Sequence, residues 1–170
     1  MHSDLIIRRL KQNATTFQSL FALAQSREEQ TWKPSPEKWC MLEIVCHLRD
    51  EEVEDFRTRV RVTIESPESF PSSIDPGSWV LQRRYIDQQY DQVVAEFLKE
   101  REKSIRFLEG LVDPNWENGY QHPQLGRLRA KDFLENWLAH DLLHIRQIVR
   151  LQHAHLGFIT QSKLDYAGPF

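Results

Sequence analysis

The stretch that decides the fold reads HDLLHIRQI over residues 140–148, inside a long helical pattern. Its two histidines, His140 and His144, are four positions apart, so on a helix they lie one turn apart on the same face. This spacing lets a helix present two imidazole nitrogens to one divalent metal ion, although it is also a common accident on long helices. The alternative is a pair of core histidines bonded to carbonyl or carboxylate oxygens. A third ligand would turn the pair into a metal site.

Composition indicates an ordinary soluble globular protein. The chain has 170 residues, of which 40% are hydrophobic and 28% are charged, and we expect one domain over residues 1–170. The net charge of −3 argues against a nucleic-acid partner. No apolar run is long enough for a membrane span, and the first residues lack the features of a signal peptide. Because Cys40 and Cys46 are too close in sequence to suggest a disulfide framework, a cytoplasmic location is expected.

Apolar residues recur at helical spacing in four segments, which predicts four amphipathic helices. The segments are residues 3–26, 41–65, 85–112 and 130–156. Together they predict an all-α fold, a four-helix bundle. The second connection, residues 66–84, is long enough to travel the length of the bundle. Helices two and three are therefore expected to run parallel, joined by this crossover.

A candidate for the third ligand lies on the second predicted helix. His47 borders the apolar stripe formed by Ile44 and Leu48, and it would join the histidine pair if the second helix faces the fourth. Three neutral nitrogens leave coordination positions for water or substrate, as in catalytic rather than structural metal sites. The alternative is a boundary histidine on a solvated face, because acidic residues cluster between positions 50 and 54.

Four neighbouring side chains are candidates for supporting the ligands or contacting a substrate. Asp50 and Glu51 share a helix face with the histidine of the second helix and could orient its ring, although a solvated face is the alternative. Gln147 follows His144 by three positions and could hydrogen-bond a substrate or a metal-bound water. Trp137 could form a wall of the pocket, and core packing explains it nearly as well.

A zinc-protease interpretation of the histidine pair is weak. That motif requires a glutamate directly after the first histidine, whereas here Asp141 follows it, and no third ligand stands at the spacing of the motif. No direct role is expected for the remaining histidines, which are His2, His122, His153 and His155.

Two blocks of this sequence carry a resemblance to a known family. They are WKPSPEKWC (32–40) with EIVCHL (43–48), and HPQLG (122–126) with WLAHDLLHIRQI (137–148). In order and separation they resemble the DinB/YfiT-like four-helix-bundle metalloproteins along nearly the whole chain. The chain differs from the family at Cys40 and at Arg129-Ala130, where a helix-capping serine or threonine is common.

The resemblance implies a bundle in up-down-down-up order and one divalent metal ion bound by His47, His140 and His144. Zinc or nickel is the metal expected first, with iron or manganese as alternatives. Because similar families include thiol S-transferases, the first hypothesis is a metal-dependent thiol S-transferase acting on small electrophiles. One alternative is a metal-dependent hydrolase using metal-bound hydroxide, and another is a non-catalytic metal-binding stress-response module. The expected partners are a small-molecule substrate, a low-molecular-weight thiol and a second copy of the chain in a homodimer.

Overall fold

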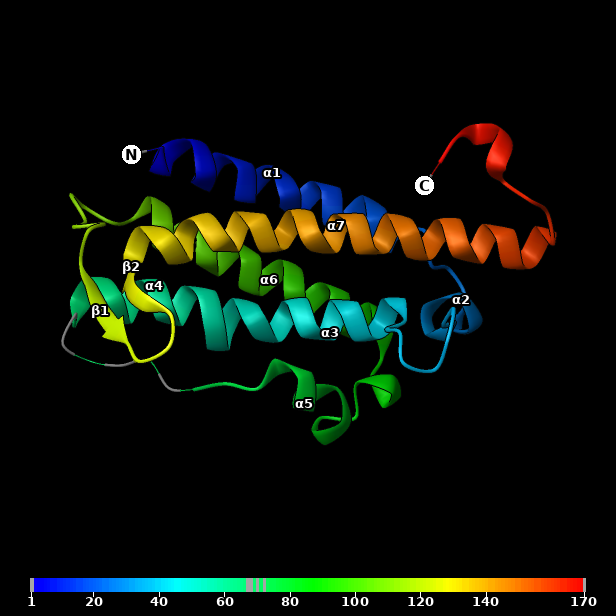
Figure 1. The fold of residues 1–170 in the computed structure, drawn as a ribbon, viewed down its shortest axis with the longest axis horizontal. Coiled ribbons are helices and arrows are strands. Elements are labelled where there is room, and N and C mark those ends of the chain that lie inside the picture. Colours follow the sequence, from blue (N-terminus) through cyan, green and yellow to red (C-terminus); the bar gives the residue numbers. More distant parts are fainter. Residues whose placement is uncertain (1, 67–68, 70, 72, 170) are drawn as a thin grey trace.

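The computed structural model describes residues 2–66, 69, 71 and 73–169, and four helical columns packed side by side dominate it (Figure 1). The columns are α1 (Ser3–Phe21), α3 with α4 (Met41–Glu51 and Arg57–Glu65), α6 (Tyr90–Glu109) and α7 (Ala130–Thr160). Helix α1 contacts α6 and α7, α6 contacts α3, and α4 contacts α7, so the columns enclose one interior. The predicted all-α four-helix bundle is confirmed.

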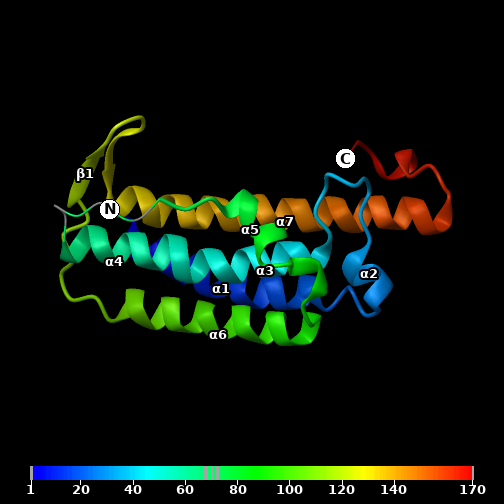
Figure 2. The same cartoon turned by 90° about the horizontal axis from the view of Figure 1, so that it is seen from below.

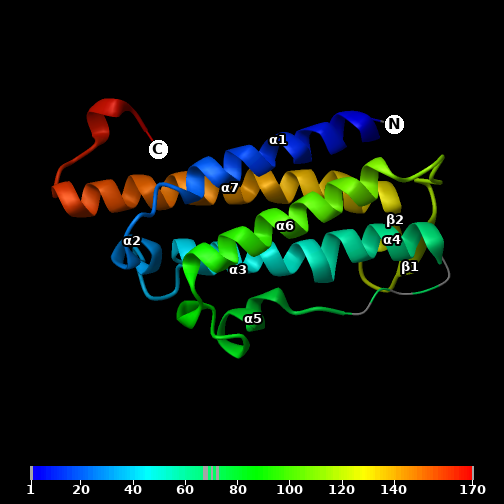
Figure 3. The same cartoon turned by 180° about the vertical axis from the view of Figure 1, so that it is seen from behind.

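The columns follow the up-down-down-up order. Helix α1 and the α3–α4 column run in opposite directions, α6 runs parallel to α3–α4, and α7 returns in the direction of α1 (Figures 1 and 2). The predicted crossover, residues 66–84, passes along the outside of α3 and brings the chain back to the start of α6 (Figure 3). Residues 67, 68, 70 and 72 of the crossover lie outside the described residues.

The crossover contains a short helix that the sequence pattern did not predict. Helix α5 (Pro76–Gln82) lies within residues 66–84, which were expected only to connect two helices. The Asp75 carboxylate accepts the backbone N–H of Ser78, and proline suits the first turn of a helix because its missing N–H would have no partner there.

Two predicted helix boundaries were wrong because capping chemistry subdivides the segments. The first helix was expected to reach residue 26, but α1 ends at Phe21 and Ser26 instead caps a separate helix, α2 (Arg27–Thr31), in a capping box with Glu29. The third was expected to start at residue 85. A short 3₁₀ turn, Tyr85–Asp87, stands there instead, and extended backbone after it delays α6 to residue 90.

A small β-hairpin precedes α7, where the sequence predicted a loop. Strands β1 (Gly119–His122) and β2 (Gly126–Arg129) pair antiparallel. Gly119 lies opposite Arg129, and a Cβ there would come within 2.4 Å of the Leu128 carbonyl oxygen. Gly126 begins the second strand at a φ of +75°, a conformation that favours glycine. Strands of four residues are too short to produce a distinct alternating pattern.

Acidic side chains cap the two helices that lack the family's serine or threonine. The Glu43 carboxylate accepts the backbone N–H of Cys40 at 3.0 Å before α3. The Asp132 carboxylate accepts the backbone N–H of Arg129 at 2.8 Å before α7. Each carboxylate also suits the positive end of the helix dipole, so neither departure from the family pattern leaves a helix start uncapped.

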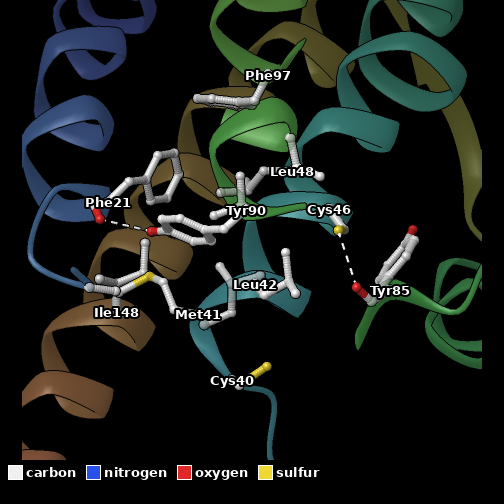
Figure 4. Packing of buried hydrophobic residues seen from close by; sticks show 14 of the residues in the cluster. Phe21, Cys40, Met41, Leu42, Cys46, Leu48, Tyr85, Tyr90, Phe97 and Ile148 are labelled. Carbon is white, nitrogen blue, oxygen red and sulfur yellow. Dashed lines mark hydrogen bonds between the residues drawn. The ribbon is translucent and has the colours of Figure 1, made fainter. Parts of the chain in front are cut away.

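Each long helix buries one apolar stripe, and the stripes meet in two core clusters. Figure 4 shows part of the larger one, in which Phe21, Phe97, Met41 and Ile148 surround Tyr90. The Tyr90 hydroxyl satisfies its buried position by donating to the Phe21 carbonyl at 2.8 Å. The outer faces remain charged, and among the described residues no helix combines the length and hydropathy needed to cross a membrane.

The interior also holds a buried ion cluster centred on Arg101 of α6. Its guanidinium is 1% exposed and bonds both carboxylate oxygens of Asp141 at 2.6 and 2.7 Å. It also donates to Glu52 at 2.9 Å and to the Leu10 carbonyl at 3.2 Å. Trp137 donates to the same Glu52 oxygen. One side chain of α6 therefore links the other three columns.

Replacing Arg101 with methionine is expected to destabilise the fold by about 3–5 kcal/mol, because it leaves two buried carboxylates without a counter-charge. Urea unfolding measures the change. Arg106→Met is the matched control, since Arg106 lies on the same helix with its side chain 71% exposed, and its effect should stay within about 0.5 kcal/mol. Equal midpoints for the two variants would show that the cluster does not stabilise the bundle.

Candidate metal centre

Three histidine side chains from two columns converge inside the bundle. His47 extends from α3, and His140 and His144 extend from α7. The Nε2 atom of His140 lies 3.2 Å from that of His47 and 3.1 Å from that of His144. One ligand nitrogen from each ring falls within 4.8 Å of the other two. The α3 and α7 columns therefore bring together the three histidines that the sequence analysis selected.

The protonation of the rings suits a cation. Burial lowers the pKa of His47 to about 3 and that of His140 to about 2, and it also lowers the pKa of His144. All three rings are therefore neutral near pH 7, and each carries one N–H. His144 donates that N–H from Nδ1 to the Gln147 amide oxygen at 2.7 Å, which leaves a lone pair on its Nε2.

The three Nε2 atoms cannot satisfy one another. If His140 carries its proton on Nε2, it can donate well to only one of the two facing nitrogens, and the other lone pair remains unpaired. A divalent cation would accept a lone pair from each nitrogen, and three imidazoles are an established ligand set for zinc. The residues present therefore fit a single divalent metal ion.

Two of the four predicted supporting residues, Gln147 and Glu51, lie next to the histidine rings. Gln147 fixes the tautomer of His144, as described above, and it also lines a cavity beside the rings. A Glu51 oxygen lies 3.9 Å from Nδ1 of His47, a buried nitrogen that has no hydrogen-bond partner among the described residues. Burial, together with neighbouring Asp55, raises the pKa of Glu51 to about 9, so it is a neutral carboxylic acid at pH 7.

Asp50 and Trp137 lie elsewhere than the sequence analysis proposed. The Asp50 carboxylate accepts bonds from Arg83 and from the Tyr85 hydroxyl, both at 2.7 Å, so it supports the crossover rather than His47. Trp137 is 1% exposed and stacks on Phe56 in the core, and it does not line the two cavities beside the histidines. Asp50 and Glu51, expected on a solvated acidic face in the alternative interpretation, are buried together with Glu52.

Two cavities of small-molecule size meet at the histidines. The first, which we call the Trp39 cavity, has a volume of about 700 Å³ and is lined by all three histidines, Trp39, Leu143 and Leu151. The second, which we call the hairpin cavity, has a volume of about 830 Å³ and is lined by His47, His140, Glu51, Asp55, Tyr120 and Phe133. Because His47 and His140 line both, a cation held there would be reached from two sides.

Sequence reasoning missed Trp39 and the ion cluster next to the site. The Trp39 ring lies 4.9 Å from that of His47, centroid to centroid. A signal for the ion cluster was present, since Arg101 falls in the apolar stripe of α6 between Phe97 and Ile105. Asp141 likewise occupies a core position on α7, one turn after Trp137. A charged residue on a buried stripe requires a counter-charge from another helix.

A family model for the DinB superfamily matches residues 9–148 of the chain. The chain belongs to the DinB superfamily.

Among solved structures, this DinB superfamily chain is similar to YfiT from Bacillus subtilis. The TM-score is 0.77 at 16% sequence identity, and the match covers 89% of this chain and 86% of YfiT. YfiT is described as "a probable metal-dependent hydrolase with an unusual four-helix bundle topology". At this identity the similarity establishes the shared fold alone. No curated protein sequence matches the chain.

Alanine substitution of His47, His140 or His144 is expected to lower the affinity for zinc by more than about 100-fold, because each substitution removes one of three ligands. Mutating a residue that only supports a ligand typically lowers metal affinity about 10- to 100-fold, and loss of a ligand itself should cost more. Zinc titration of untagged protein against a chromophoric chelator measures the affinity. His2→Ala, which removes an exposed histidine near the N-terminus, should bind zinc like the wild type. Unchanged affinity in any of the three variants would remove that histidine from the ligand set.

Proposed function

We propose that this DinB superfamily protein binds one divalent metal ion through His47, His140 and His144 and uses it as an enzyme acting on small molecules. The support is the convergence of three neutral Nε2 atoms beside two cavities. Zinc or nickel suits three imidazoles best, with iron or manganese as alternatives. When bound, such a cation supplies positive charge that stabilises an anionic nucleophile at neutral pH.

For the reaction we propose transfer of a low-molecular-weight thiol to a small electrophile. The observation that carries this proposal is that His47 and His140 separate two cavities, each large enough for one reactant. In the transfer, the thiolate sulfur bonds to the electrophilic carbon, and the leaving group departs with its electron pair. The walls of the two cavities would hold the reactants on opposite sides of the histidines, which favours their approach.

Hydrolysis is the second candidate, and one feature of the hairpin cavity favours it. Glu51 lies next to His47 and close to Asp55 and Arg59, so a carboxyl group is available beside the site for proton transfer to or from water. The description of YfiT as a probable metal-dependent hydrolase agrees with this candidate. Hydrolysis requires only one organic reactant, however, and leaves the second cavity without a role.

Zinc-loaded protein is expected to convert 1-chloro-2,4-dinitrobenzene to its thioether only when a thiol such as cysteine or glutathione is added. The rate, followed by absorbance, should exceed that of the free thiol and fall at least about 100-fold in His140→Ala, because the nucleophile is no longer stabilised. His2→Ala is the matched control. Thiol-independent cleavage of an ester panel would favour hydrolysis. No turnover of either kind would favour a non-catalytic metal-binding module, the stress-response alternative.

We also propose that the chain forms a homodimer through α7. Three exposed apolar residues, Leu142, Val149 and Leu156, recur every seven positions on its outer face, which is the spacing of a two-helix seam. Light scattering should show a dimer for the wild type and a monomer for Val149→Glu combined with Leu156→Glu. Leu81→Glu, at an exposed leucine of α5, should remain dimeric. A monomeric wild type would contradict the proposal.

A further inference from the structure

Three cationic side chains line the Trp39 cavity from two separate parts of the chain. Lys38 lies in the segment before α3, and Arg146 and Arg150 lie one turn apart on α7. All three are exposed. Within the described residues none of them forms a side-chain hydrogen bond or an ion pair. Lys38 interacts electrostatically with the neighbouring Glu37 carboxylate, whereas the charges of Arg146 and Arg150 are available to a bound molecule.

The lack of partners distinguishes these cations from the arginines that hold the fold together. Arg49 pairs with Asp50 and Glu96, and Arg57 pairs with Glu100. By contrast, Arg146 and Arg150 place like charges four positions apart on a helix, an arrangement that disfavours the helix unless an anion is bound nearby. The helix dipole favours a positive charge only in the last turn of a helix. Arg146 and Arg150 lie well before the last turn of α7, so the dipole does not stabilise them.

The acidic residues near the histidines lie mainly on the other side. The one acidic side chain among the residues that line the Trp39 cavity is Glu37, whose carboxylate accepts the Ser35 hydroxyl at 2.6 Å. The hairpin cavity is lined by Glu51, Asp55 and Asp132. Asp55 pairs with Arg59, which also lines the hairpin cavity, and Asp132 pairs with Arg129. The cations of the Trp39 cavity therefore favour an anionic reactant on that side.

The remaining walls of the Trp39 cavity suit an apolar body. Trp39, Leu143 and Leu151 line it together with the three histidines. The Trp39 ring lies 6.5 Å from that of His144, with the two planes nearly parallel, so a flat face borders the metal ligands. A molecule lying on this face would reach the histidines at one end and the arginines at the other.

We propose that the Trp39 cavity selects a small substrate with an apolar body and an oxyanionic group, such as a carboxylate, that pairs with Arg146 and Arg150. Lys38 adds positive charge from the opposite element. Guanidinium groups suit this role because their planar donors bind two oxygens of one anion. The inference rests on the proposed function, because the reacting end of the substrate is placed at the histidines.

Calorimetric titration of zinc-loaded protein with three probes tests this selection. Phenylacetate and phenyl phosphate carry an oxyanion on a similar apolar body, and phenylacetamide is the uncharged analogue. The wild type is expected to bind at least one anion about 10-fold more tightly than the amide. In Arg146→Gln combined with Arg150→Gln, the affinity for that anion should fall about 10-fold while the affinity for the amide stays within about two-fold. Because both proteins carry zinc, any anion contact with the metal is common to them and the difference reports the arginines.

Arg61→Gln is the matched control, since Arg61 is an exposed arginine of α4 outside both cavities, and it should bind all probes like the wild type. Equal anion affinities in the wild type and the double variant would overturn the inference, as would an amide that binds as tightly as both anions. Zinc content is measured separately on each sample. A wild-type protein that holds no zinc but still binds the anion more tightly than the double variant does would contradict the proposed metal function. This inference about the arginines would then still stand.

Discussion

The arrangement of the bundle depends on one buried cation. Arg101 of α6 reaches Glu52 in the second column, Asp141 on α7 and the Leu10 carbonyl on α1, so a single guanidinium touches every other column. The two carboxylates raise the pKa of Arg101, although its burial acts in the opposite direction, and it remains charged. Because the donors of a guanidinium lie in one rigid plane, these bonds define both the height and the rotation of the columns around it. A bundle held by apolar contacts alone would tolerate small helix rotations more easily.

The rotation of α7 connects this ion cluster to the three histidines. Asp141 directs its carboxylate toward Arg101, and the residue before it, His140, is therefore turned about 100° around the helix, toward His47. The second column likewise directs neighbouring residues to the ion cluster and to the histidines. Asp50, Glu51 and Glu52 are consecutive and point respectively to Arg83, His47 and Arg101. The π-helical segment Glu52–Phe56 begins within this run, and such segments widen the turn and often occur at functional sites.

Much of the fold and the histidine set could be predicted from the sequence because both follow from periodicity. Apolar spacing identified the four columns, the length of residues 66–84 indicated the crossover, and the i,i+4 histidines pointed to α7. Helix boundaries were missed where local capping residues divide a segment, and the surroundings of two site candidates depend on partners that are distant in sequence. Asp50 resembles one member of a solvated acidic run until Arg83 and Tyr85 meet it. The direction of the Trp137 side chain could not be inferred either, because Glu52, its partner, comes from another column.

The two sides of the histidine cluster differ in charge, and this difference has a chemical consequence. A cation bound by three neutral imidazoles keeps its full charge, so it attracts anions from both cavities. On one side Asp55 is paired with Arg59, whereas on the other side Lys38, Arg146 and Arg150 reinforce that attraction. An anionic reactant would therefore favour the Trp39 cavity, which is lined by all three histidines, whereas the hairpin cavity is lined by His47 and His140. The surrounding side chains, more than the three ligands, would decide which molecule approaches from each cavity.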